Sequence, residues 1–396
     1  MAPDIDLTVL RRIHVVGVGG AGMSAIAEVL ATMGHEVTGS DLKDSTGLER
    51  LRALGVTVRV GHDAANVRDA DLVTRSTAIA DNNVECRAAQ KRGIPLFSRA
   101  QVLGGICLLR DTVAVAGTHG KTTTASMLAL VLREAGLRPS FIIGGDVNEI
   151  GTGAAWDDGQ IFVVEADESD GSFLDLERRV AVVTNVEPDH LEYHGDFAGL
   201  RTAFRRFVQE TDGVTVVGID DEGGRRLAEG SGVVTVGTAV GATWRIESVY
   251  EAWEGVSFDL VGPGGECLPI QVPLPGLHNA RNAAAAAVVG LVVGSPPEAV
   301  IDALARFGGV ARRFEHRGAA AGVEFVDDYA HLPTEVATTI RACRSGSWSR
   351  LVAVFQPHRY SRTESLAASF AEAFDGADVV YVTEVFPAGE SPRPGV

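Results

Sequence analysis

A loop rich in glycine and threonine, set between an apolar run and a helical pattern, constrains this chain more than any other stretch. It covers residues 117–124, Gly-Thr-His-Gly-Lys-Thr-Thr-Thr, after the apolar residues 112–116 and before a helical pattern at 123–133. In a strand–loop–helix unit of this kind, backbone N–H groups and the helix N-terminus face the phosphates of a nucleotide. The lysine adds a positive charge, and a threonine hydroxyl reaches a magnesium ion. The sequence therefore predicts a site for a nucleoside triphosphate and Mg²⁺.

The loop departs from the usual phosphate-loop pattern at one position. The first glycine of that pattern would stand five residues before Gly120, where this chain has Val115. A glycine turn that carries a lysine by chance is the alternative, and the flanking strand and helix argue against it. The residues expected to contact the triphosphate are Gly117, Thr118, His119, Gly120, Lys121, Thr122 and Thr123.

Length and charge limit the class of protein. A chain of 396 residues exceeds one ordinary core and indicates two or three domains. Its 35 basic and 52 acidic residues give a net charge of −17, which argues against non-specific binding of nucleic acid. The four cysteines are far apart, residues 1–10 lack the layout of a signal peptide, and no apolar run is long enough to span a membrane. We expect a cytoplasmic protein without nucleic-acid or membrane partners, either a monomer or a weak homo-oligomer.

A second glycine loop stands near the N-terminus. Gly17, Gly19 and Gly22 match the G-x-G-x-x-G pattern after a strand at 13–18, and Asp41 lies 19 residues beyond Gly22. This arrangement is typical of dinucleotide sites, and alone it would favour a nicotinamide-dependent oxidoreductase. Because the same turn binds any diphosphate at a helix N-terminus, the pattern predicts a diphosphate and leaves its identity open.

Apolar runs alternate with helical patterns along the chain, and this alternation predicts parallel sheets in every domain. One boundary falls near residues 109–110, because a new strand and the phosphate loop follow, and the other falls at residues 308–309. A stretch at about 233–272 is rich in β-forming residues. The expected fold is α/β with three domains: a Rossmann-like domain at 1–110, a central phosphate-loop domain at 111–308 and a C-terminal Rossmann-like domain at 309–396.

Polar residues follow two predicted strands of the central domain. Glu165 comes directly after the apolar run 161–164 and opens an acidic loop, at the strand end where α/β sheets bind ligands. Glu165 is therefore a candidate Mg²⁺ ligand, and a solvated acidic loop is the alternative. His190 follows the next strand, but imidazole suits Mg²⁺ poorly, so a capping or exposed histidine is the default interpretation.

Asn279 and Asn282 stand three residues apart at the start of a predicted helix, and hence on one face of it. Carboxamides can form paired hydrogen bonds with adenine N6 and N7, so the two residues are candidates for adenine recognition. Helix capping by Asn279 is the alternative, and both roles can hold at once.

Taken together, these stretches resemble the Mur ligase family, from Ile13 to the last residue. The motifs that carry the resemblance are HVVGVGGAGMS (14–24), GSD (39–41), RSTAI (75–79), GTHGKTTT (117–124), EADESDGSFL (165–174), TNVEPDH (184–190), PGLHNARN (275–282), GGVARRFE (308–315), DDYAHLPTE (327–335), QPHRYSRT (356–363) and PAGE (387–390). The resemblance implies that ATP phosphorylates the carboxylate of UDP-N-acetylmuramate and that the amine of L-alanine then displaces phosphate. This reaction belongs to the cytoplasmic synthesis of peptidoglycan precursors.

The resemblance also implies residue roles. Thr122, Glu165 and His190 would bind Mg²⁺, with two ions expected and Mn²⁺ as a possible substitute. Asn279 and Asn282 would face adenine, with Arg313 on the nucleotide and Asp328 on the ribose. Catalytic roles would fall to Lys121, Glu165, His190, Arg313, His331, His358, Arg359 and Arg362, and Tyr329 would join the last four at the amino-acid site. The residues that would bind the UDP-sugar are Gly17, Gly19, Gly20, Gly22, Ser40, Asp41, Ser76 and Thr77.

Two departures from the family pattern stand out. The family usually has His-His-Pro where this chain has His331, Leu332 and Pro333, and its third domain usually continues beyond the equivalent of Val396. We therefore expect an incomplete C-terminal domain. Three alternatives stay open at this point: the ligase that reattaches recycled tripeptide to the muramate, a nicotinamide oxidoreductase, and an inactive nucleotide-binding fragment.

Overall fold

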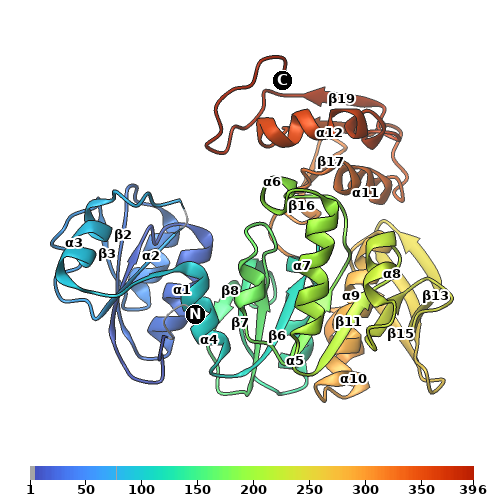
Figure 1. The fold of residues 1–396 in the computed structure, drawn as a ribbon. Coiled ribbons are helices and arrows are strands. Elements are labelled where there is room, and N and C mark those ends of the chain that lie inside the picture. The colour runs from blue at the N-terminus through green and yellow to red at the C-terminus, as the bar shows by residue number, and fades with distance from the viewer. Residues whose placement is uncertain (1–4, 77) are drawn as a thin grey trace.

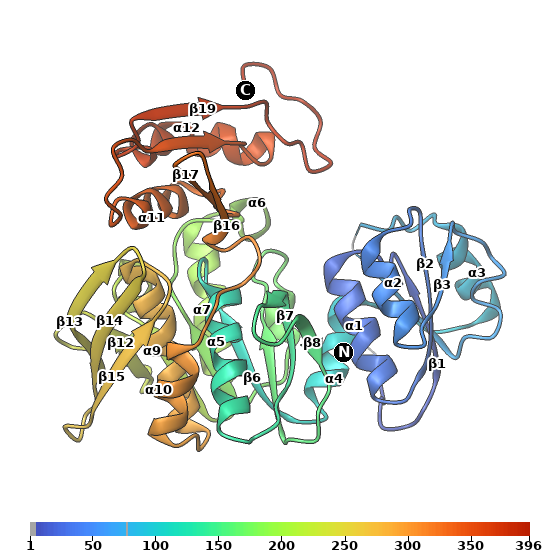
Figure 2. The same ribbon diagram turned by 180° about the vertical axis from the view of Figure 1, so that it is seen from behind.

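The computed structural model describes residues 5–76 and 78–396, which form three α/β domains (Figure 1). The first and middle domains lie side by side, and the third lies across one end of the middle domain, next to α6 and far from α10 (Figures 1 and 2). The expected three-domain α/β architecture is confirmed. Within the described residues, no helix is long and apolar enough to cross a membrane.

The first domain is a five-stranded parallel sheet with strand order β3-β2-β1-β4-β5. Its elements are β1 (Arg12–Val16), α1 (Ala21–Thr32), β2 (Glu36–Asp41), α2 (Thr46–Ala53), β3 (Thr57–Val60), β4 (Leu72–Arg75), α3 (Val84–Arg92), β5 (Leu96–Ser98) and α4 (Arg99–Cys107). The strand order reverses between β1 and β4, and ligands of such sheets bind beyond the strand ends at this point. The first glycine loop leaves β1 there, as its sequence predicts.

The middle domain is built on a ten-stranded sheet with order β15-β14-β13-β12-β11-β10-β6-β9-β7-β8. Its strands are β6 (Asp111–Ala116), β7 (Ser140–Val147), β8 (Thr152–Ala155), β9 (Ile161–Glu165), β10 (Val180–Val183), β11 (Val214–Gly218), β12 (Val234–Gly237), β13 (Trp244–Ala252), β14 (Gly255–Val261) and β15 (Cys267–Val272). Its helices are α5 (Lys121–Glu134), the 3₁₀ turn η1 (Ser172–Asp175), α6 (Leu191–His194), α7 (Phe197–Gln209), α8 (Glu222–Ala228), α9 (Leu277–Val292) and α10 (Pro297–Ala305). The predicted β-rich stretch corresponds to β12–β15.

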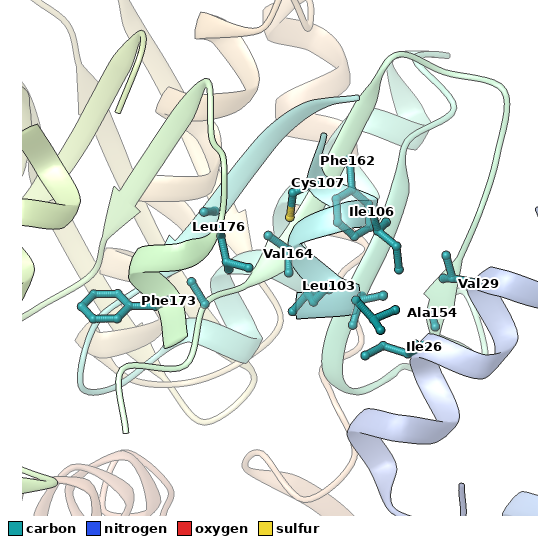
Figure 3. Close-up of a cluster of buried hydrophobic side chains, with 14 of the residues drawn as sticks. Ile26, Val29, Leu103, Ile106, Cys107, Ala154, Phe162, Val164, Phe173 and Leu176 are labelled. Atoms are coloured by element: carbon teal, nitrogen blue, oxygen red, sulfur yellow. The ribbon is translucent and has the colours of Figure 1, made fainter. Parts of the chain in front are cut away.

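An apolar cluster joins the first two domains (Figure 3). Ile26 and Val29 of α1 meet Ala154 of β8, and Leu103 and Ile106 of α4 lie in the same cluster. All five side chains are buried. Since apolar burial stabilises by about 25 cal/mol per Å², this contact holds the first sheet firmly against the middle domain. The predicted boundary near residues 109–110 therefore separates two domains that share one apolar cluster.

The third domain contains β16 (Glu315–Ala320), β17 (Val323–Asp327), α11 (Pro333–Cys343), β18 (Val352–Phe355), α12 (Tyr360–Ala373) and β19 (Val379–Val382). β18 and β19 pair in parallel, as the alternation predicts, but β16 and β17 form an antiparallel hairpin. The expectation of parallel sheets in every domain is wrong here. Ala321 and Gly322, both at positive φ, link these strands directly, and a two-residue link can only join antiparallel neighbours. The middle sheet is also partly antiparallel, at β7–β8 and β13–β15.

Candidate active site

Three neighbouring strands of the middle sheet bring the predicted phosphate-binding and acidic loops together. In the order β10-β6-β9, the strands run parallel, so their carboxyl ends meet at one edge. The phosphate loop follows β6, the acidic loop 166–171 follows β9 and the loop 184–190 follows β10. Residues far apart in the sequence thus share one site, at the edge where parallel sheets bind ligands.

The phosphate loop needs its two glycines for reasons of geometry. Gly117 and Gly120 have φ of +133° and +78°, a region that residues with a side chain rarely adopt. A Cβ on Gly117 would come within 2.0 Å of Thr184 Oγ1, and one on Gly120 within 2.3 Å of Asn282 Oδ1. The loop therefore packs closely against the residues just after β10 on one side and against α9 on the other. α5 begins directly after it, at Lys121.

Lys121 lies among carbonyl and carboxylate oxygens. Its ammonium donates to the carbonyls of Gly117 at 2.6 Å and Thr118 at 3.2 Å, and it pairs with Glu168 Oε2 at 2.9 Å. Burial alone would lower the pKa of Lys121, but the carboxylates of Glu168, Glu165 and Asp167 raise it. Burial raises the pKa of Glu168 while the nearby ammonium lowers it. Because the two charges are in direct contact, each favours the charged form of the other.

Glu165 lies where a hard cation would bind beside the phosphates. The Thr122 hydroxyl donates to both of its carboxylate oxygens, at 3.0 and 3.1 Å, and the Gly144 N–H donates at 2.8 Å. Hydroxyl and carboxylate oxygens are the ligands that Mg²⁺ prefers. Two of the three predicted metal ligands are therefore in contact and fit this ion. His190, the third, comes from the end of a different strand, and its Nε2 lies 3.2 Å from Asp189. No group of three or more His, Cys, Asp or Glu side chains suited to a metal is found within residues 5–76 and 78–396.

The predicted adenine residues line a cavity of about 370 Å³ between the middle and third domains. Asn279, Asn282, Arg313 and Asp328 all face it, together with Gly120 and Thr122 of the phosphate loop. Asn279 lies in the first turn of α9, and its side chain donates to the carbonyl of Pro275 at 2.9 Å. The N-cap residue is Gly276 and no described side chain caps this helix, so the helix-capping alternative for Asn279 is wrong. Asp328 accepts the N–H groups of Phe314 and Ala330, and burial raises its pKa to about 6.

His278 lines the same cavity and was not singled out from the sequence, although it precedes the first asparagine. Burial, with Arg281 and Arg341 nearby, lowers its pKa to about 4, so its imidazole is neutral. Its Nδ1 has no hydrogen-bond partner among the described residues. A neutral ring nitrogen without a partner, on a residue that lines a cavity, can form a hydrogen bond with a nucleotide base. The position of His278 directly before Asn279 is the sequence feature that could have pointed to it.

The predicted amino-acid-site residues gather in the third domain. The rings of Tyr329, His331 and His358 lie 5.2 to 6.3 Å apart. Arg362 lies 3.2 Å from His358 Nδ1 and 3.5 Å from Asp189 of the middle domain. Burial and the Arg362 charge lower the pKa of His358 to about 4, so this ring is neutral at pH 7. Arg359, at the start of α12, donates its backbone N–H to the carbonyl of Phe386.

The first glycine loop is held by the end of β2. The N–H groups of Gly17 and Val18 donate to the carbonyl of Ser40, and the Gly19 N–H donates to Asp41 Oδ2 at 2.9 Å. The Ser40 hydroxyl is fully buried and donates to Glu85 Oε2 at 2.6 Å. Ser40 thus supports the loop through its backbone, and its side chain points away from the ligand side.

The remaining predicted UDP-sugar residues follow the same edge. Gly20 and Gly22 flank the start of α1, and Ser76 follows β4, where its Cβ would lie 3.4 Å from a Cβ on Gly17. Thr77, also predicted, lies outside the described residues.

Arg99 is a site residue that the sequence did not reveal. A Cβ on Gly22 would lie 2.6 Å from its Nη1, so this guanidinium covers the N-terminus of α1. Its Nη2 lies 4.0 Å from Asp167 Oδ2 of the middle domain. Arg99 and Gly22 line a second cavity, of about 540 Å³, which also contains Lys121 and Glu165. Only the packing of α4 between the domains brings these four residues together.

Comparison with known proteins agrees with this geometry. Three family models match successive parts of the chain: the Mur ligase family catalytic domain at 12–110, the Mur ligase middle domain at 115–290 and the Mur ligase glutamate ligase domain at 312–394. The UDP-N-acetylmuramate–L-alanine ligase of Thermobifida fusca is 46% identical over 99% of this chain and 86% of its own length. The enzyme of the same name from Saccharopolyspora erythraea is 47% identical over 99% and 83%.

Solved structures give the same picture. A UDP-N-acetylmuramate–alanine ligase from Thermotoga maritima has a TM-score of 0.83 at 31% identity, covering 95% of this chain and 86% of that one. A UDP-N-acetylmuramate:L-alanyl-γ-D-glutamyl-meso-diaminopimelate ligase from Neisseria meningitides has a TM-score of 0.68 at 31% identity, over 77% of this chain and 100% of that one.

Proposed function

The chain belongs to the Mur ligase family, and we propose that it uses ATP to join L-alanine to the carboxylate of UDP-N-acetylmuramate in peptidoglycan precursor synthesis. The relatives named for this reaction match nearly the full chain at 46–47% identity. The tripeptide ligase from Neisseria meningitides has a lower TM-score than the alanine ligase from Thermotoga maritima, 0.68 against 0.83. A nicotinamide oxidoreductase would leave the phosphate loop and the two asparagines without a use.

One observation carries the proposal: the phosphate loop forms the wall between two cavities. Gly120 and Thr122 line the cavity with the asparagines, whereas Lys121 lines the cleft with the first glycine loop. A nucleotide on one side and a UDP-sugar acid on the other would therefore meet at Lys121. This is the arrangement that transfer of a phosphoryl group between two bound substrates requires.

The chemistry balances in two steps. First, a carboxylate oxygen of the muramate bonds to the γ-phosphorus of ATP, the bond from that phosphorus to the β–γ bridging oxygen breaks, and ADP leaves. Second, the amine nitrogen of L-alanine bonds to the acyl carbon, phosphate departs with the bonding pair, and the amine loses a proton. The first step gives the carboxylate the leaving group that it otherwise lacks.

The chain's own residues would stabilise the charge that moves in these steps. Lys121 would leave the loop carbonyls for the β- and γ-phosphates, and the loop N–H groups would face the same oxygens. Thr122 and Glu165 would hold Mg²⁺, which neutralises phosphate charge when bound, and His190 would contact a second ion. Arg99 would neutralise the diphosphate of the UDP-sugar or its carboxylate at the start of α1.

The third domain would supply the amine. Tyr329, His331 and His358 would shape the L-alanine site, with Arg359 and Arg362 steadying the transferring phosphoryl group. Asn279 and Asn282 would bind adenine, with Arg313 and Asp328 on the rest of the nucleoside. We also propose that the protein acts in the cytoplasm as a monomer or weak homo-oligomer.

Release of phosphate, measured with each substrate omitted in turn, tests the proposal. We expect turnover only when ATP, Mg²⁺, UDP-N-acetylmuramate and L-alanine are all present. Faster turnover with the tripeptide L-alanyl-γ-D-glutamyl-meso-diaminopimelate than with L-alanine would instead identify a recycling ligase. Oxidation of NADH by the protein would show that the first glycine loop was misassigned, and no turnover with any set would identify an inactive nucleotide-binding protein.

A further inference from the structure

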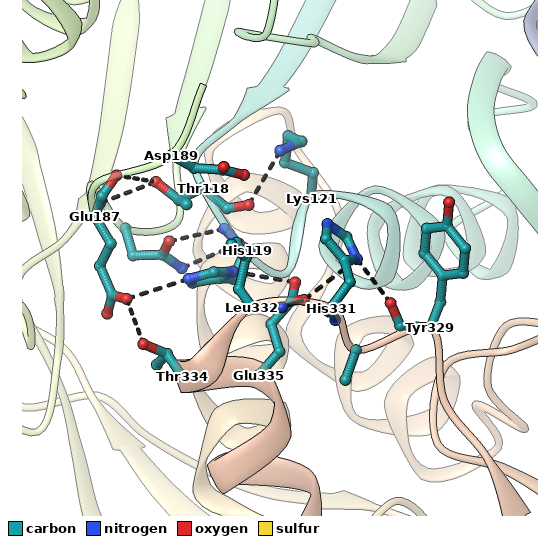
Figure 4. A network of polar contacts seen from close by, with 12 residues as sticks. Thr118, His119, Lys121, Glu187, Asp189, Tyr329, His331, Leu332, Thr334 and Glu335 are labelled. Carbon is teal, nitrogen blue, oxygen red and sulfur yellow. Dashed lines mark hydrogen bonds and ion pairs between the residues drawn. The ribbon is translucent and has the colours of Figure 1, made fainter. Parts of the chain in front are cut away.

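A polar network crosses from the phosphate loop to the third domain (Figure 4). His119, in the middle of the phosphate loop, lies between two carboxylates. Its Nε2 is 3.2 Å from Glu187 Oε2 of the middle domain, and its Nδ1 is 3.1 Å from Glu335 Oε1 of the third domain. The exposed fractions of the His119 and Glu335 side chains are 16% and 15%, so little water competes for the contact between them.

The backbone of His119 is fixed as well as its ring. Its N–H donates to Asn185 Oδ1 at 2.8 Å, and its carbonyl accepts from Asn185 Nδ2 at 3.0 Å and from Thr184 Oγ1 at 2.5 Å. Asn185 and Thr184 belong to the loop after β10, next to the phosphate loop. The imidazole therefore cannot shift far unless the phosphate loop itself moves.

Glu335 makes a second connection with its other oxygen. Oε2 accepts the backbone N–H of His331 at 2.9 Å and of Leu332 at 3.1 Å, at the start of α11. His331 Nδ1 in turn lies 2.8 Å from the carbonyl of Tyr329. One carboxylate thus bridges the phosphate loop and the segment that carries the predicted amino-acid-site residues.

We propose that His119 and Glu335 are positioning residues that couple the phosphate loop to the L-alanine site, so that a nucleotide-ordered loop fixes the segment 329–332 in place. The inference rests on the proposed function and adds to it a physical link between the two substrate sites. Coupling between sites is reciprocal, so L-alanine also tightens nucleotide binding through the same pair.

A double-mutant cycle tests the coupling. His119→Asn removes the imidazole, whereas Glu335→Gln removes the charge and keeps an oxygen that can accept the N–H groups of His331 and Leu332. We expect each variant to raise the KM for L-alanine about tenfold, the middle of the range for coupled sites. The KM for UDP-N-acetylmuramate should stay within about twofold, and the double variant should be no worse than either single one. Effects that multiply to about a hundredfold in the double variant would overturn the inference.

Thr334→Val is the matched control. The Thr334 hydroxyl donates to Glu187 Oε2 at 2.9 Å across the same interface, and not to the segment 329–332. Its loss should change the KM for L-alanine by less than about twofold, within the range of ordinary exposed substitutions. An effect equal to that of Glu335→Gln would mean that any contact across the interface matters, and would contradict the specific link.

Hydrogen–deuterium exchange gives a readout that does not depend on turnover. The probe is the non-hydrolysable analogue AMP-PNP with Mg²⁺, added to the intact protein. In the wild type, the analogue should slow exchange across residues 329–340, which contain the N–H groups that Glu335 holds; in His119→Asn the slowing should be lost. Equal slowing in both proteins would overturn the inference even when phosphate release is normal. Loss of L-alanine-dependent phosphate release in the wild type would instead refute the proposed function.

Discussion

Two replacements at and around Lys121 should show that thermal stability and phosphate release depend on different properties of this lysine. The lysine ammonium is the close positive partner of Glu168, whose side chain is 2% exposed. Lys121→Met removes that partner and leaves a buried carboxylate unpaired, which costs about 3–5 kcal/mol in comparable sites. For a domain of this size the loss corresponds to a fall in the melting temperature of roughly 10 °C.

The pair can be neutralised together to recover stability without recovering activity. In Lys121→Met with Glu168→Gln, the buried charge is gone and an amide can bond to the loop carbonyls that the lysine held. We expect most of the lost melting temperature to return, as buried ion pairs are often replaceable by neutral groups. Phosphate release should stay absent in both variants, since neither supplies a positive charge at the β- and γ-phosphates.

Calorimetry supplies the two measurements that decide the matter. Thermal scans follow the melting temperatures, and titration with UDP-N-acetylmuramate follows binding at the first domain, which both variants should retain. The reasoning would be refuted if the double variant were as unstable as Lys121→Met, because the buried charge would then not be the cause. Equal loss of UDP-sugar binding would refute the assignment of the two glycine loops.

Four further results are expected. Glu165→Gln should raise the Mg²⁺ concentration for half-maximal phosphate release by at least about tenfold; an unchanged Mg²⁺ titration would exclude Glu165 as a ligand. Asn282→Ala should weaken ATP binding by about 1–3 kcal/mol and reduce the preference for ATP over GTP, and an unchanged preference would place adenine elsewhere. Asp41→Ala should lower the affinity for UDP-N-acetylmuramate about tenfold by calorimetry, because the Gly19 N–H loses its acceptor. Burial lowers the pKa of His119, but Glu187 and Glu335 outweigh burial and bring this pKa to about 9. The protonated ring therefore stabilises the fold by at most about 3 kcal/mol, fully below pH 6.5, and this stabilisation disappears as pH rises through 9. Melting curves of the wild type should show this loss, and those of His119→Asn should not.

Much of the site could be predicted because its parts are local. Each key loop follows an apolar strand directly, and the glycines, Lys121 and Glu165 stand at fixed distances from the strand end. Parallel pairing then brings the strand ends together without further information. Asn279 and Asn282 were found in the same way, from their spacing at a helix start. In these cases one short stretch of sequence determines both the type of residue and its position on the strand or helix.

The missing parts are those that depend on how the domains pack. Arg99 reaches the start of α1 only because α4 lies between two sheets, and Glu335 meets His119 across 216 positions of sequence. The hairpin was missed for a different reason. A strand at 323–326 is predicted and corresponds to β17, but its partner β16 is largely exposed, and the β16 sequence Glu-His-Arg-Gly-Ala-Ala has no alternation of apolar and polar residues to mark a strand.

The two glycine loops show why a loop pattern alone does not identify a ligand. Both place backbone N–H groups at a helix N-terminus, and both need glycine at positive φ, at Gly17 and at Gly120. Their surroundings differ. The first loop lies beside Asp41 and Arg99, at the edge of a cleft. The second carries Lys121, which pairs with Glu168, and Thr122, whose hydroxyl donates to Glu165. A loop without a lysine or a metal ligand can bind a diphosphate but has little means to stabilise phosphoryl transfer. From the side chains around each loop we propose the binding role for the first and the chemical role for the second, with the two meeting at the cleft that contains Arg99 and Lys121.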